Sequence, residues 1–142
     1  MDQELNKLEA SLAHATTLID RVNAQNGLAE YLSKSDTRRS LEMAIAAESL
    51  ARQAAYPQGL VIALRNQAQN YRKLGDHATA LRVSNNARLV LDEIDFASEA
   101  AVVARTMGFI YSDLGDYAKA LKCHINALSL YEETKNLSQQ AN

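Results

Sequence analysis

The feature that most constrains this chain is a sequence segment that recurs 40 positions later. Residues 71–81 read YRKLGDHATAL, and residues 111–121 read YSDLGDYAKAL. Residues 31–41, YLSKSDTRRSL, keep the tyrosine, the aspartate and the final leucine at the same offset. Several matches at one offset without a gap indicate an internal repeat with a period of 40 residues. A unit of that size cannot bury its apolar face alone, so we expect each unit to pack against its neighbours.

The residues at the centre of each copy predict two helices joined by a tight turn. Gly75 and Gly115 can adopt the left-handed conformation that closes a helix. Asp76 and Asp116 follow, where a side-chain oxygen can cap the next helix. One proline and five glycines in 142 residues leave few helix breakers elsewhere. We therefore expect an all-α fold.

The 40-residue register divides the chain into segments. They are an N-terminal helical cap or extension at 1–17, a degenerate first unit at 18–57, a second unit at 58–97, a third unit at 98–137 and the start of a fourth unit at 138–142. First helices are predicted near 18–34, 58–74 and 98–114, and second helices near 36–54, 76–94 and 116–134. The sequence leaves open whether 1–17 extends the first helix or forms a separate one. Because 138–142 match the beginning of a unit, we expect the chain to be part of a longer protein.

These residues resemble the tetratricopeptide repeat family, in the 40-residue variant of bacterial signalling and regulatory proteins. The resemblance covers residues 18–137 and rests on the turn glycine together with an aromatic and two small positions. The matching residues are Tyr71, Gly75, Ala80 and Ala87 in the second unit and Tyr111, Gly115, Ala120 and Ala127 in the third. The first unit departs from the pattern, with Ser35 in place of the turn glycine. The resemblance implies a right-handed α-solenoid of antiparallel helix hairpins, with HEAT and armadillo repeats as the alternative.

The resemblance also implies that a ligand lies along the face formed by the first helices. The places carried over onto this sequence are Arg65, Asn66, Gln69, Arg105 and Phe109, and Arg72 and Lys73, one turn further on, extend them. We expect Arg65 and Arg105 to form a cationic ladder for a carboxylate or an acidic peptide, because guanidinium binds carboxylates bidentately. The alternative is an ordinary solvated face. Gln25 and Ala29 stand where the family's carboxylate clamp needs Lys and Asn, so we do not expect that particular ligand.

Composition argues against several other classes of partner. A net charge of -2 and a pI near 5.9 give no reason to expect the basic face that nucleic acid requires. No stretch approaches the roughly 18 consecutive apolar residues that span a bilayer. The single cysteine, Cys123, cannot form an intrachain disulfide, which favours a reducing compartment. We expect a cytoplasmic protein without nucleic-acid or membrane partners.

The reactive residues form no catalytic or metal-binding pattern. His14, His77 and His124 do not share a helix face with carboxylates at the spacing of metal ligands. Cys123 and His124 are adjacent, and neighbours on a helix point about 100° apart. We find no glycine-rich phosphate loop, nucleophile elbow or pair of carboxylates. We expect no enzyme, metal site or cofactor, and we interpret Cys123 and His124 as packing residues.

The predicted function is therefore binding of a protein or peptide. By analogy with other arrays of this period, we expect the regulatory or sensory N-terminal segment of a larger signalling protein, with a cyclase or a transcription regulator as its output. One alternative is a homo-oligomerisation scaffold, in which exposed apolar surface at the array ends pairs two copies. Another is an accessory role beside an enzymatic domain elsewhere in the protein.

Overall fold

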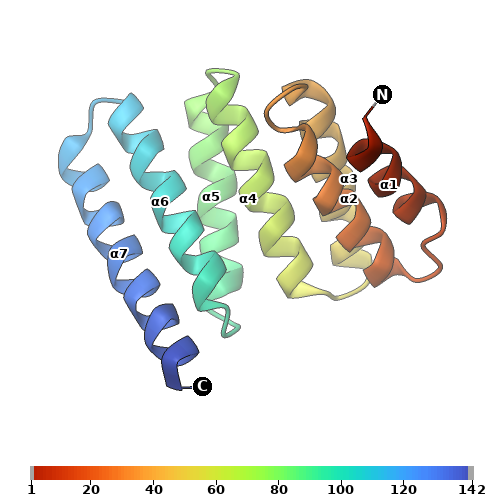
Figure 1. Ribbon diagram of the computed structural model, residues 1–142. Coiled ribbons are helices and arrows are strands. Elements are labelled where there is room, and N and C mark those ends of the chain that lie inside the picture. Colours follow the sequence, from red (N-terminus) through yellow and green to blue (C-terminus); the bar gives the residue numbers. More distant parts are fainter. Residues whose placement is uncertain (1, 141–142) are drawn as a thin grey trace.

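The computed structural model describes the backbone of residues 2–140 and the side chains of residues 2–137. Helices account for almost all of this range, and no strand occurs within it. The seven helices are α1 (Gln3–Ala13), α2 (Leu18–Leu32), α3 (Thr37–Gln53), α4 (Pro57–Lys73), α5 (His77–Leu91), α6 (Ala97–Asp113) and α7 (Tyr117–Gln140). Consecutive helices lie side by side (Figure 1). The expected all-α fold is confirmed.

The helices are arranged in two layers. Helices α2, α4 and α6 contact one another in order, whereas α3, α5 and α7 contact only their neighbours along the chain. Each first helix of a predicted unit therefore lies in one layer and each second helix in the other. The six helices from α2 to α7 begin within one residue of their predicted starts.

The turn between α4 and α5 shows how the repeat glycine works. Gly75 has a φ of +83°, which an L side chain rarely adopts. Beyond it, the amide of Asp76 donates to the carbonyl oxygen of Tyr71 at 2.9 Å, and the Asp76 carboxylate accepts from the amide of Thr79 at 3.2 Å. One helix is closed and the next is capped within a few residues. Gly115 repeats the geometry between α6 and α7, with a φ of +82°.

The first unit closes differently because Ser35 replaces the glycine. No residue between α2 and α3 has a positive φ. The amide of Asp36 donates to the carbonyl oxygen of Leu32, four residues earlier, at 2.8 Å, as in an α-helical turn. Asp36 still caps α3, because its carboxylate accepts from the amide of Arg39 at 3.1 Å. The departure from the repeat pattern thus changes the turn and leaves the start of the next helix in place.

At the N-terminal end the structure shows whether the segment before α2 is a separate helix, and at the C-terminal end α7 is longer than predicted. Helix α1 ends at Ala13 and α2 begins at Leu18, capped by the Thr17 hydroxyl, so the N-terminal segment is a separate helix packed on α2. Helix α7 continues to Gln140, past the predicted start of a fourth unit at residue 138. Residues 141–142 of that predicted unit lie outside the described residues.

The core lies between the two layers, and small residues allow the layers to approach. Two positions of the second helices are small and buried in every unit. They are Ser40, Ala80 and Ala120, and Ala47, Ala87 and Ala127. Larger side chains such as Val22, Leu64 and Ile110 fill the space around them. Overpacking of such positions is costly because protein interiors have little free volume.

Candidate ligand-binding faces

Arg65 lies between carboxylates of two other helices. Its Nη2 is 3.0 Å from Glu30 Oε1 on α2 and 2.8 Å from Glu99 Oε1 on α6. Its Nε also donates to Glu99 Oε2 at 3.2 Å. The side chains of Arg65 and Glu99 are each 13% exposed. Because its charge is already paired bidentately, Arg65 joins three helices of one layer and offers little to a ligand.

Asn66 is also buried rather than presented to solvent. It is 3% exposed, and its Oδ1 accepts a hydrogen bond from Arg65 Nη1 at 2.9 Å. The residues at the same repeat position, Asn26 and Thr106, are buried as well. The Asn26 amide donates to the carbonyl oxygen of Gly59 at 3.1 Å. This position therefore supplies hydrogen bonds within the layer.

The other four predicted residues meet in one hollow between α4 and α6, which we call the α4–α6 pocket. It has a volume of about 270 Å³. Its lining consists of Gln69, Arg72 and Lys73 from α4 and Arg105, Thr106 and Phe109 from α6. The resemblance thus led to most of the pocket but also to Arg65 and Asn66, which do not line it.

Asp113 holds Arg72 in place at the edge of this pocket. Arg72 Nε donates to Asp113 Oδ2 at 2.6 Å, and His77 Nε2 lies 3.2 Å from the same oxygen. The hydrogen bond from Arg72 keeps the pKa of Asp113 below its ordinary value, although desolvation opposes the shift. The Arg72 guanidinium also lies 5.0 Å from the centre of the Phe109 ring. Arg72 is therefore partly neutralised and supports the aromatic ring.

Arg105 and Lys73 are the cations of the pocket whose hydrogen-bond donors are available to a ligand. Arg105 is exposed and forms no ion pair in the described part of the chain. Lys73 Nζ donates to the carbonyl oxygen of Ser33 at 2.6 Å, which uses one of the three donors of an ammonium group. Phe109, one helical turn from Arg105, is 41% exposed. Together they place positive charge beside an apolar ring.

His124 fixes the other side of Phe109. The two rings meet edge to face, with their centres 5.0 Å apart. A Cβ atom added to Gly108 would lie 2.6 Å from His124 Cε1, so the glycine permits this close approach of α6 and α7. The interpretation of His124 as a packing residue is confirmed.

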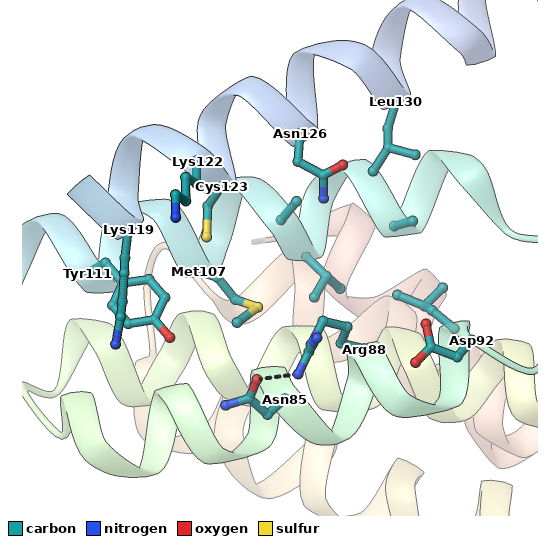
Figure 2. A pocket seen from close by; sticks show the side chains of 14 residues that line it. Asn85, Arg88, Asp92, Met107, Tyr111, Lys119, Lys122, Cys123, Asn126 and Leu130 are labelled. Atoms are coloured by element: carbon teal, nitrogen blue, oxygen red, sulfur yellow. Dashed lines mark hydrogen bonds between the residues drawn. The ribbon is translucent and has the colours of Figure 1, made fainter. Parts of the chain in front are cut away.

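A larger cavity of about 570 Å³ lies between α5 and α7, with α6 as its floor (Figure 2). We call it the α5–α7 groove. Val103 and Met107 of α6 face it, whereas Arg105 and Phe109 point about half a helical turn away, into the α4–α6 pocket. None of the residues predicted from the sequence to bind a ligand lines this groove.

The described residues provide no preformed metal site or membrane span. No group of three or more His, Cys, Asp or Glu side chains in this part of the chain is placed to hold a metal ion. None of the described helices is long and apolar enough to cross a bilayer.

No protein-family model matches this sequence, and no curated protein matches it either. The resemblance to tetratricopeptide repeats therefore stays a prediction, carried by the repeat residues, and the function has to be inferred from the geometry.

Proposed function

We propose that this chain is a peptide-binding module that takes an acidic segment of a partner protein into the α4–α6 pocket. The observation that carries the proposal is the placement of Arg105 and Lys73 beside the exposed ring of Phe109. Arginine and aromatic side chains, phenylalanine included, are enriched in protein interfaces relative to the rest of the surface. In this proposal the helices form the right-handed solenoid of antiparallel hairpins that the resemblance implies, and the module performs no chemistry of its own.

The charges of the pocket distinguish the roles of its residues. Arg72 is engaged by Asp113, so a carboxylate of the peptide meets Arg105 and Lys73 first. Arg105 can bind a carboxylate with two parallel hydrogen bonds, and Lys73 adds a point charge. Phe109, held between Arg72 and His124, receives an apolar neighbour of the acidic residue. We therefore expect recognition of an acidic residue adjacent to an apolar one.

The size of the pocket favours a peptide over a whole small molecule. Pockets that enclose drug-sized ligands usually measure about 300–1,000 Å³, and this one measures about 270 Å³. One or two side chains fill such a volume, and the rest of a peptide can lie along the exposed surface of the layer. In this arrangement the module serves as the regulatory or sensory segment of a signalling protein.

Peptide titration tests the proposal. A fluorescein-labelled pool of peptides built from Asp, Glu and Leu is titrated and compared with a matched pool in which Lys replaces the acids. We expect anisotropy to rise only with the acidic pool and the affinity to fall with salt. The variant R105E should weaken binding by roughly tenfold or more, since a tenfold change is only about 1.4 kcal/mol.

The exposed residue Arg38 on α3 provides the matched control. It lies outside the pocket, so R38E makes the same change in net charge without touching the lining. Equal affinity of R105E and R38E, with unchanged helicity by circular dichroism, would remove the pocket from the proposal.

A second candidate function, homo-oligomerisation, is favoured by the outer face of α7. Four large apolar side chains follow one another along it at helical spacing and are 58–70% exposed. They are Tyr117, Leu121, Ile125 and Leu128. Exposed apolar patches of this kind often mark protein interfaces. Sedimentation velocity at increasing concentration should show a dimer that the double variant L121E/I125E abolishes. A wild-type chain that stays monomeric throughout would exclude this candidate.

A further inference from the structure

The α5–α7 groove is open because α6 lacks two large side chains that its counterpart α4 carries. At the repeat positions of Leu60 and Leu64 in α4, helix α6 has Ala100 and Ala104. The two leucines are buried, and they belong to the core cluster beneath α3 and α5. The two alanines instead line the groove, and α6 lies less closely against α5 than α4 does against α3. The groove thus lies at a position where, in the preceding unit, the side chains of Leu60 and Leu64 fill the space.

The lining of the groove carries a net positive charge. Its rim has Arg88, Lys119 and Lys122 together with one acidic residue, Asp92. The corresponding positions one unit earlier are Glu48, Thr79, Arg82 and Arg52, so the net formal charge of these four positions is +2 in the groove and +1 in the preceding unit. The Arg88 guanidinium donates one hydrogen bond among the described residues, to Asn85 Oδ1 at 3.3 Å. Lys122 forms no ion pair among the described residues, and Lys119 is 3.7 Å from Asp116. The rim has positive charge to offer a ligand.

The two lysines of the groove lie at the end opposite Leu130. Lys119 and Lys122 lie toward one end, Arg88 near the middle, and Leu130 and Asp92 toward the other end (Figure 2). Lys122 and Leu130 are separated by roughly 12 Å along α7, given a rise of about 1.5 Å per residue. The apolar stretch of the lining consists of Leu91, Ala100, Val103 and Leu130, and it borders one acidic residue, Asp92, next to Leu91.

We propose that the α5–α7 groove is a binding site for a small amphiphilic anion, an elongated molecule with a carboxylate or similar head and an apolar body. Lys119, Lys122 and Arg88 receive the head, and the apolar stretch of the groove takes the body. The volume of about 570 Å³ lies within the range of about 300–1,000 Å³ that is usual for small-molecule sites. This site is separate from the α4–α6 pocket, because the two cavities open on opposite sides of α6.

Isothermal titration calorimetry with decanoate, below its micelle concentration, tests the proposal. We expect saturable binding with one site per chain. The uncharged decanol and the cationic decyltrimethylammonium share the apolar body, so each should bind at least about tenfold more weakly than decanoate. Equal binding of the three amphiphiles, or no saturable binding of decanoate, would overturn the proposal.

Two variants locate the ligand. A104L restores the leucine of the preceding unit and should abolish binding by filling the groove. K122E should weaken binding by roughly tenfold or more while leaving the groove open. The matched control is R82E, which changes the same repeat position on α5 outside the lining. If A104L loses its helical signal, K122E and R82E still decide the matter. Equal affinity of these two variants contradicts the proposal.

Two further measurements distinguish decanoate binding in this groove from binding of another kind of ligand there and from binding in the peptide pocket. R105E should leave decanoate affinity unchanged, so failure of the peptide proposal and failure of this one are distinguishable. An acidic amphipathic helical peptide is titrated in parallel. If that peptide binds in a manner sensitive to A104L and K122E while decanoate does not bind, the groove is a helix-docking site and our proposal is wrong.

Discussion

Arg65 Nη2 lies 2.8 Å from Glu99 Oε1, and this ion pair joins α4 to α6 across the boundary between two repeats. Both side chains are largely buried, so removal of either one leaves a charge with poor access to water. R65M should therefore reduce the free energy of unfolding by about 3 kcal/mol. E99Q should cost less, about 1–2 kcal/mol, because Arg65 retains Glu30. Urea denaturation measures both changes.

The exposed pair of Arg39 and Glu9 serves as the control for that prediction. Its side chains are 41% and 45% exposed, so R39M should cost less than about 1 kcal/mol. A double variant R65M/E99L should be less destabilised than the sum of its single changes, since it leaves no unpaired charge. Equal effects of R65M and R39M would contradict the structural role assigned to Arg65.

Backbone conformation at the helix ends predicts opposite effects for two substitutions. Gly75 has a φ of +83° with no atom within 4 Å of an added Cβ, so G75A meets only backbone strain. It should destabilise the fold by about 1 kcal/mol. Ala55, at the end of α3, has a φ of +49°, and A55G should stabilise by a few tenths to about 1 kcal/mol for the same reason. Thermal melting curves should move in opposite directions. A shift of the same sign in both would contradict the argument.

The positions of the helices were predictable because the signals that set them are local. The glycine and aspartate of each turn act within a few residues, so Asp36, Asp76 and Asp116 place three helix starts without any knowledge of the tertiary structure. The N-terminal segment could not be assigned in this way. Its separation from α2 depends on a break at His14–Thr17 that carries neither glycine nor proline.

The candidate sites were harder to predict because they depend on partners distant in the sequence. The carboxylates that pair with Arg65 belong to Glu30 and Glu99, on other helices and at no repeat offset from it. The residue pattern along α4 alone therefore could not show that Arg65 is paired with carboxylates of other helices. The α5–α7 groove depends on missing volume at Ala100 and Ala104, a signal that appears only when successive units are compared position by position.

The Arg72–Asp113 pair predicts a dependence of stability on pH. The pKa of Asp113 is lower in the folded protein than its ordinary value of 3.8, chiefly through the hydrogen bond from Arg72. A lowered carboxyl pKa stabilises the fold above the ordinary value, and this contribution is lost as the pH falls through the folded pKa. D113N should therefore be less stable than the wild type at pH 6. The difference should shrink below pH 4. Urea denaturation at several pH values measures it, and a constant difference down to pH 2 would exclude the linkage.

Cys123 provides a chemical probe of the α5–α7 groove, because it is the only cysteine and lies in the lining. Burial raises the pKa of its thiol, while the positive charge of Arg88 opposes the shift. Since the thiolate is the reactive form, alkylation by iodoacetamide at pH 8 should be slower in the native protein than in guanidinium. R88M should move the midpoint of the pH–rate curve further upward, whereas R82M should not. An unchanged midpoint in R88M would show that Arg88 does not act on the thiol, and decanoate in the groove should slow the reaction in the wild type.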